Sequence, residues 1–287
     1  MKELPFPHSI LRLPEILFQE SPLSHPMKRR IQHIHIPKCA GNSVLSAIKE
    51  ALQPRQVHVM DAIATYFAAR KLKHCQNEFE FESIHLEVKQ VILSLFFEKG
   101  FDLISGHYPF SPLTSAQFKE TTDFITVLRD PLERLKSHIA YLIFAQPRTC
   151  VEDYYTGKVD PAAEVDRIIH HDSIGEWLPR QQTIYLGGLG SDGKADLANR
   201  VPNAIAALDQ LRVVGFDHDL PQLAQRLEDA YGVPFQIGSE NSIRDVQKND
   251  ALRKRVYDAF EGSMKNTLIQ MSADDLEFYE AARAQWD

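Results

Sequence analysis

The 287-residue sequence predicts an α/β fold in which a parallel sheet is covered by helices on both faces. Short apolar segments alternate along the chain with segments of helical periodicity, as expected for strands joined by crossover helices. Two of the apolar segments, 31–36 and 124–128, run directly into a turn and then a helix. Hydrophobic residues make up 44% of the chain, enough for one α/β core. We therefore expect an irregular, proline-rich arm over residues 1–29 and a single domain over 30–287.

The individual elements follow from local patterns. Strands are expected where short apolar runs are bounded by turn residues, at 31–36, 101–105, 124–128 and 211–216. Helices are expected where apolar residues recur at helical spacing, at 44–52, 59–73, 84–99, 131–144, 161–170, 180–186, 220–231, 251–264 and 274–286. Ser272 and Asp275 lie at capping-box spacing before the last helix. In such a sheet, ligands bind at the carboxyl ends of the strands.

The first strand ends in the sequence Pro37-Lys38-Cys39-Ala40-Gly41-Asn42-Ser43. A strand–loop–helix of this kind directs several backbone N–H groups to one point, and the helix N-terminus favours negative charge there. The Lys38 ammonium and the Ser43 hydroxyl add to this preference. Residues 38–43 are therefore predicted to bind a phosphate group. The loop is not a Walker A loop, because the G-x-x-x-x-G-K-[ST] spacing is absent.

The strand at 124–128 is followed by a second candidate anion site. Arg129 lies where the strand ends, and its planar guanidinium can bind two phosphate oxygens. Ser137, about two turns into the next helix, can donate one more hydrogen bond. A structural ion pair of Arg129 with Asp130 or Glu133 is the alternative, and Asp130 is expected to cap the turn. Two anion sites on adjacent strand ends imply a ligand with two separated phosphate groups.

Together these motifs resemble the sulfotransferases that use 3′-phosphoadenosine 5′-phosphosulfate (PAPS), above all the heparan 2-O-sulfotransferase group and its soluble bacterial members. The segment 35–43 is similar to that family's 5′-phosphosulfate loop, and the segment 128–137 to its 3′-phosphate motif. The resemblance extends from about residue 30 to the C-terminus. It implies a P-loop-like nucleotide-binding core, PAPS as co-substrate and no metal. Cys39 and Asn42 depart from the family pattern, which has Thr at both positions.

The resemblance also implies a division of chemical roles. A sulfotransferase must hold the donor, neutralise the leaving phosphate and take a proton from the acceptor. Lys38 is expected to neutralise the leaving phosphate. His107 is expected to be the general base, because imidazole titrates near neutrality and the family carries its catalytic histidine in a matching Gly-His turn. Gly106 is expected to leave room for the acceptor.

The acceptor side is expected to include His35, Tyr108, Arg180 and Gln182. Because side chains alternate between the faces of a strand, His35 could support the site while His33 is interpreted as structural. Arg180 and Gln182 fall in a segment that lines the acceptor cleft in the family. Residues 240–242 and the basic residues 253–255 correspond to a region that completes the nucleotide site there.

Composition restricts the partners. A net charge of −7 and a sequence pI of about 5.9 argue against an extended nucleic-acid surface and, mildly, against a long polyanionic acceptor. A small-molecule or glycan acceptor is therefore expected. Cys39, Cys75 and Cys150 lack metal-type spacing and cannot all pair, which favours a reduced cytoplasm. The N-terminus does not resemble a signal peptide, and no run approaches the roughly 20 apolar residues of a membrane span.

Two other functions remain open at this point. A nucleotide-dependent phosphotransferase would share the strand–loop–helix, but it would normally have a Walker A loop and a carboxylate for Mg²⁺. A catalytically silent binding protein would keep the site of Arg129 and Ser137 yet tolerate loss of Lys38 or His107, and both of these are present. Metal dependence would separate the phosphotransferase from a sulfotransferase.

Overall fold

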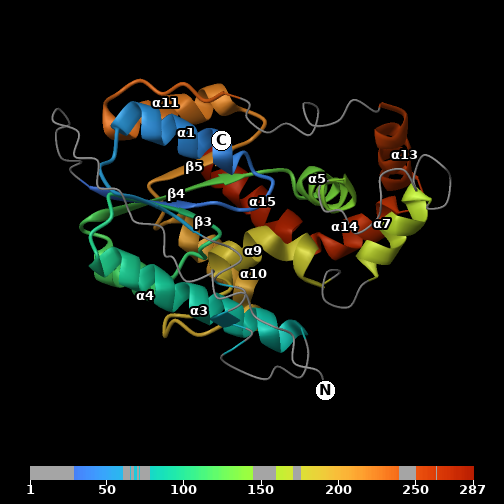
Figure 1. The fold of residues 1–287 in the computed structure, drawn as a ribbon, viewed down its shortest axis with the longest axis horizontal. Coiled ribbons are helices and arrows are strands. Elements are labelled where there is room, and N and C mark those ends of the chain that lie inside the picture. Colours follow the sequence, from blue (N-terminus) through green and yellow to red (C-terminus); the bar gives the residue numbers. More distant parts are fainter. Residues whose placement is uncertain are drawn as a thin grey trace, which may run out of the picture.

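The computed structural model describes residues 29–60, 78–144, 160–170, 176–238, 250–262 and 264–287, with residues 65, 68, 69 and 71. Its centre is a five-stranded sheet in the order β2-β3-β1-β4-β5, and each neighbouring pair is parallel (Figure 1). The strands are β1 (Arg30–Ile34), β2 (Val57–Val59), β3 (Leu103–Gly106), β4 (Thr122–Leu128) and β5 (Val213–Phe216). The predicted parallel α/β architecture is confirmed.

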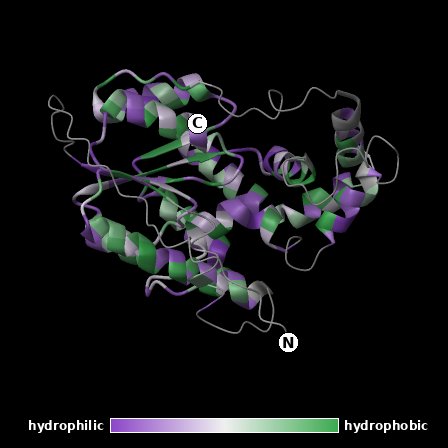
Figure 2. Cartoon of the chain, viewed as in Figure 1, coloured by the Kyte–Doolittle hydropathy of each residue, from purple (hydrophilic) through white to green (hydrophobic). Residues whose placement is uncertain are grey.

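Helices cover both faces of the sheet. Above the sheet in Figure 1 lie α1 (Gly41–Leu52) and α11 (Leu220–Tyr231), and below it lie α3 (Glu78–Glu98) and α10 (Arg200–Leu208). Side chains of β4 point alternately to the two helix layers. Ile125 and Val127 pack with α1 and α11, whereas Phe124 and Leu128 pack with α3, α10 and α15 (Ala273–Trp286). Burial on both faces explains why the strands form nearly continuous apolar runs. In Figure 2 the central strands are mainly hydrophobic, while the helices mix both classes.

A second hydrophobic cluster lies beside the sheet, to the right in Figure 1. It joins α5 (Pro131–Phe144), α7 (Pro161–Ile169), α13 (Asp250–Glu261), α14 (Lys265–Met271) and the short 3₁₀ turn Leu178–Arg180. Helix α9 (Gln181–Gly187) follows that turn directly and contacts both α10 and α15. Gln182 of α9 bonds the backbone of Arg129, so α9 lies against the carboxyl end of β4.

Several local expectations differ from the structure. Residues 57–59 form an edge strand, whereas a helix was expected from residue 59, most of which lies outside the described residues. Helix α4 (Pro112–Phe118) was not expected; Ser111 caps it by accepting a hydrogen bond from the Thr114 N–H. The capping box at Ser272 is wrong, because Ser272 makes no side-chain cap, and the Asp275 carboxylate instead accepts hydrogen bonds from backbone groups of α9. Residues 1–28, Cys75, Cys150 and the segment 240–242 lie outside the described residues.

The strand order fixes where a ligand site should be. The chain leaves β1 through α1 and reaches β2 on one side, whereas it leaves β4 and reaches β5 on the other side. The connections of two adjacent strands thus diverge at the carboxyl ends of β1 and β4, which is the topological switch point of an open α/β sheet. Both candidate anion loops, after Ile34 and after Leu128, begin at this point.

Candidate active site at the carboxyl ends of β1, β3 and β4

The loop after β1 has an unusual backbone. Lys38 and Ala40 both adopt left-handed conformations, with φ angles of 69° and 54°. Such a residue costs about 1–2 kcal/mol when it is not glycine, and strain of this kind concentrates at functional sites. Ala40 is the N-cap of α1 and provides no side-chain cap. Because the first N–H groups of a helix have no acceptor within the helix, those of Gly41 and Asn42 are available to an anion.

Gly41 is required by its contact with a histidine. A Cβ atom placed at Gly41 would lie 1.8 Å from Cδ2 of His35. The backbone of the loop therefore packs directly against the imidazole of His35, and any side chain at position 41 would displace that ring.

Lys38 and Cys39 have different environments. The Lys38 ammonium lies 4.8 Å from the centroid of the Tyr141 ring on α5, in cation–π geometry. Partial burial, and then the charge of Arg129, lower the pKa of Lys38. Cys39 is only 1% exposed, and burial raises the pKa of its thiol to about 12. The Cys39 side chain is therefore a protonated packing group and not a reactive thiolate.

Arg129 is held at the end of β4 from several sides. The Gln182 amide bonds both backbone groups of Arg129: its Oε1 accepts from the N–H at 3.0 Å, and its Nε2 donates to the carbonyl at 2.9 Å. The guanidinium Nε pairs with Asp217 at 3.0 Å, and NH1 donates to the Lys38 carbonyl at 3.3 Å. The ion-pair partner is thus Asp217, directly after β5, and not a carboxylate of α5. Asp130 caps α5 as expected, by accepting hydrogen bonds from the N–H groups of Leu132 and Glu133.

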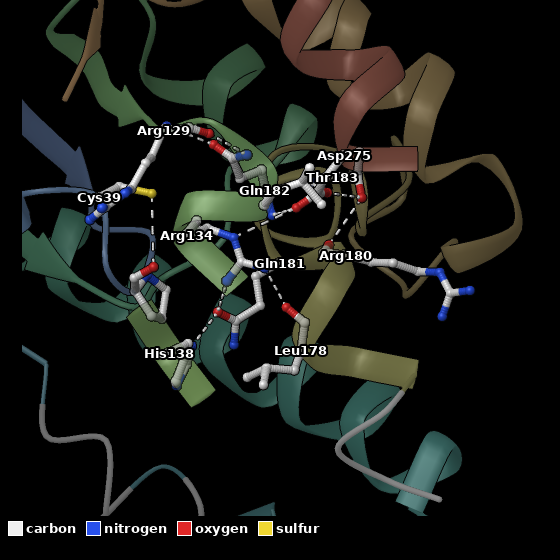
Figure 3. Close-up of polar contacts among 12 residues, drawn as sticks. Cys39, Arg129, Arg134, His138, Leu178, Arg180, Gln181, Gln182, Thr183 and Asp275 are labelled. Atoms are coloured by element: carbon white, nitrogen blue, oxygen red, sulfur yellow. Dashed lines mark hydrogen bonds and ion pairs between the residues drawn. The ribbon is translucent and has the colours of Figure 1, made fainter. Parts of the chain in front are cut away.

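A buried polar network behind Arg129 fixes Gln182 in place (Figure 3). Arg134 on α5 is fully buried and donates to Gln181 Oε1 at 2.9 Å and to the Leu178 carbonyl. Its Nε lies 3.8 Å from Asp275 on α15, and that carboxylate accepts from the N–H groups of Gln182 and Thr183 at 3.0 and 2.9 Å. Removal of one partner of such a buried pair strongly destabilises a protein, because the other charge is left buried and unpaired. The network therefore joins α5, α9 and α15, and Arg134 is structural.

His107 follows β3 and belongs to a row of histidine rings. Its ring lies 4.6 Å from that of His35, which stacks on His33 at 5.8 Å. The His107 Nδ1 donates to the His35 carbonyl at 2.7 Å, so Nδ1 carries the proton and Nε2 carries the lone pair. Burial, opposed by this hydrogen bond and supported by the charge of Lys89, lowers the pKa of His107 to about 4. This differs from the near-neutral value expected, and it leaves the imidazole in its basic form at pH 7.

The glycine before His107 has a different role from the one expected. Gly106 has a φ angle of 137°, and a Cβ there would lie 2.5 Å from the Cβ of Met60. Met60, and not an incoming acceptor, thus occupies the space that the glycine leaves. His33 is buried and bonds Ser105 Oγ at 2.9 Å, in agreement with the structural role assigned to it.

Sequence reasoning missed a buried lysine close to His107. Lys89 on α3 is 4% exposed, and its ammonium donates to the Tyr185 hydroxyl at 3.3 Å. Burial lowers the pKa of Lys89 to about 8. The Tyr185 ring lies 6.1 Å from the His107 ring, so Lys89 and Tyr185 border the candidate base. A lysine within an amphipathic helix carries no sequence signal that would distinguish it from a solvated one.

The residues expected on the acceptor side bond other protein groups. The Tyr108 hydroxyl bonds His58 Nε2 at 2.8 Å, and the Tyr108 side chain is buried. Arg180 bonds Asp274 and the Glu176 carbonyl, and in Figure 3 its side chain extends away from Arg129. Gln182 bonds Arg129 as described above. His35 contacts His107, and Ser137 on α5 is 7% exposed. Contact of any of these residues with a substrate stays a prediction.

The described residues contain neither a cluster of metal ligands nor a helix that could span a membrane. No three histidine, cysteine or acidic side chains in the described ranges are grouped as metal ligands; His171 and Asp172 lie outside those ranges. No helix among the described segments combines the length and the apolar character that a membrane span needs.

The similarities of this chain to solved structures are distant. No family model and no curated protein matches the chain. A sulfotransferase from Alicyclobacillus acidocaldarius shares 14% identity over 88% of this chain and 96% of its own, with a TM-score of 0.39. A structure of the PezAT chromosomal toxin–antitoxin system of Streptococcus pneumoniae shares 8% identity over 92% of this chain and 91% of its own, with a TM-score of 0.35. TM-scores of this size support no conclusion about activity, so the function of the site is argued from its residues.

Proposed function

We propose that this protein transfers a sulfuryl group from PAPS to a hydroxyl of an acceptor, with a carbohydrate as the expected acceptor class, and releases adenosine 3′,5′-bisphosphate. The observation that carries the proposal is the pair of cationic loops at the ends of β1 and β4. Lys38 and Arg129 lie on these adjacent loops, and the Arg129 guanidinium bonds the Lys38 carbonyl. Two linked anion sites suit a nucleotide with phosphate groups on both its 3′ and 5′ oxygens.

The residues of the first loop fit the 5′ end of such a donor. The N-terminus of α1 has no side-chain cap, so its N–H groups can bind phosphate oxygens. Lys38 is half-buried, and its ammonium lies over the face of the Tyr141 ring. Among the described residues, no carboxylate forms an ion pair with it. Its role is to place a positive charge where negative charge builds on the leaving phosphate, which is the main catalytic demand of group transfer of this kind.

His107 is the proposed general base. The bond from Nδ1 to the His35 carbonyl fixes the tautomer and leaves Nε2 to accept the acceptor's hydroxyl proton. The side chain is only partly exposed, so the base can be reached while the ring stays oriented. The depressed pKa means that no prior deprotonation is needed at neutral pH, although it makes His107 a weaker base than free imidazole.

This proposal is tested by incubating the protein with sulfur-35-labelled PAPS and a panel of acceptors, and measuring transfer of the label. We expect label to appear in at least one hydroxyl-bearing acceptor, with release of the bisphosphate, in buffer that contains EDTA. His107→Ala should slow the label transfer by roughly 10²-fold or more, and His170→Ala, at the exposed C-cap residue of α7, should not slow it. Transfer of phosphate from ATP that requires Mg²⁺, without transfer from PAPS, would support the phosphotransferase instead.

A further inference from the structure

The Asp217 carboxylate lies beside a candidate anion site, where a second negative charge is unexpected. It follows β5 directly, and its side chain is 17% exposed. Its Oδ2 lies 3.0 Å from Nε of Arg129, the residue proposed to bind the 3′-phosphate. A negative charge there repels a second anion, so the carboxylate weakens phosphate binding unless its contact with Arg129 has a compensating effect.

The compensating effect is the orientation of the guanidinium. Arginine has five N–H donors in a rigid plane and a long side chain with much rotamer freedom. The bonds to Asp217 and to the Lys38 carbonyl use Nε and one hydrogen of NH1. Among the described residues no acceptor bonds NH2 or the second hydrogen of NH1, so these donors can bind a phosphate. The Gln182 amide holds the backbone of Arg129, but among the described residues only Asp217 and the Lys38 carbonyl hold its guanidinium.

The same guanidinium also supports the strained loop. The carbonyl that accepts from NH1 belongs to Lys38, whose φ angle is 69°. A left-handed lysine persists only where its surroundings hold it. Arg129 thus contacts the backbone of the loop that carries the Lys38 ammonium, and Asp217 determines from which direction it does so.

We propose that Asp217 is a positioning residue that holds the Arg129 guanidinium against the Lys38 carbonyl, so that the 3′-phosphate subsite and the Lys38 loop are set as one unit. This inference rests on the proposed function. It extends it by assigning a residue of a third strand end and by coupling the two phosphate subsites.

Calorimetric titration with adenosine 3′,5′-bisphosphate and with 5′-AMP tests the coupling, because 5′-AMP has no group for the 3′ subsite. Wild-type protein should prefer the bisphosphate at least ~10-fold. Asp217→Ala should reduce that preference below ~3-fold. It should also lower the affinity for 5′-AMP by ~3-fold or more, because the Lys38 loop loses its support. Asp217→Asn should retain or tighten both affinities, because its amide oxygen can still accept from Nε of Arg129 and the repelling charge is gone.

Controls separate this role from a general loss of structure. Asp229→Asn removes a carboxylate of the same charge from an exposed position on α11 and should change neither affinity. If circular dichroism shows that Asp217→Ala does not fold, Asp217→Ser replaces it with the same expected affinities. The serine side chain is too short for its hydroxyl to reach Nε of Arg129.

Each outcome decides between the possibilities. The inference is overturned if Asp217→Ala keeps the bisphosphate preference, if it tightens bisphosphate binding, if 5′-AMP binds it as tightly as it binds wild type, or if Asp217→Asn behaves as the alanine variant does. Those results leave the proposed function standing when wild-type protein still prefers the bisphosphate. A wild-type protein without that preference overturns both.

Discussion

Mild acid should destabilise this protein, because four histidines are neutral in the folded state. The pKa values of His33, His35, His107 and His138 are lowered to about 3, 2, 4 and 3, with burial as the largest cause in each case. In the unfolded chain each returns to a pKa near 6.5. As the pH falls below 6.5, the unfolded chain therefore takes up protons that the folded protein does not. Stability from this source is complete above that pH and is lost as the pH falls toward the folded pKa values.

The magnitude follows from the same values. At pH 5.5, one unit below the unfolded pKa, each histidine lowers the free energy of unfolding by about 1 kcal/mol relative to neutral pH. These four histidines, with His58, whose pKa is lowered to about 4, together amount to several kcal/mol, a large part of the roughly 5–15 kcal/mol of a typical domain. Burial raises the pKa of Asp217 and of Asp275, which acts in the opposite direction, but only as those carboxylates become protonated.

Urea unfolding followed by tryptophan fluorescence at pH 7.5, 6.5 and 5.5 measures this loss. The side chain introduced by His33→Asn cannot be protonated and can still bond Ser105. Between pH 7.5 and 5.5 the free energy of unfolding of this variant should therefore fall by about 1 kcal/mol less than that of wild type. His170→Asn, an exposed position, should follow the wild-type curve. Equal wild-type stability at pH 7.5 and pH 5.5 would refute the reasoning, since it would mean that these rings are protonated or solvated in the folded protein.

The remaining predictions concern turnover. Lys38→Ala should lower kcat more than it lowers affinity for the bisphosphate product, which steady-state kinetics and calorimetry compare; normal turnover at saturating donor would make Lys38 merely positional. His107→Ala should lose roughly 10²-fold or more in kcat while the bisphosphate still binds. Because the pKa of His107 is about 4 and that of Lys89 about 8, the wild-type rate should stay level between pH 7 and 6, and a decline through that range would contradict the burial described. Lys89→Met should raise the pKa of His107, measured by NMR, because it removes a nearby positive charge. EDTA should leave turnover unchanged.

The sequence was informative where the signal is local. The loop 38–43 and the turn at Arg129 are recognisable because a strand, a turn and a helix start occupy a few consecutive residues, and the fold brings both to the switch point. The cap at Asp130 and the structural role of His33 also follow from local context, and the structure confirms them.

The partners of these residues could not be predicted, because they are distant in the chain. The contacts of Arg129 with Gln182 and Lys38 span 53 and 91 residues. Nothing near Arg129 indicates that its carboxylate partner follows another strand. Gln182 resembles an acceptor-cleft residue in sequence, whereas its amide bonds the Arg129 backbone. Ser272 and Asp275 match the capping-box spacing, but tertiary contacts of α15 with α9 engage the Asp275 carboxylate instead.

The pKa of His107 shows a third limit. Its candidate role follows from residue type and from its place after a strand, but its electrostatics depend on burial, on the His35 carbonyl and on Lys89 of a separate helix. These are properties of packing between elements, so the near-neutral expectation was wrong although the position in the sheet was predicted.

Calorimetry with adenosine 3′,5′-bisphosphate, 5′-AMP and ATP in metal-free buffer tests the central claim most directly. The bisphosphate should bind at least ~10-fold tighter than 5′-AMP, because an Arg-paired phosphate is worth more than ~1.4 kcal/mol. Arg129→Ala should remove that difference and leave the fold intact. Equal affinities for the bisphosphate and 5′-AMP, or tight binding of ATP that appears only when Mg²⁺ is added, would contradict a site built for PAPS.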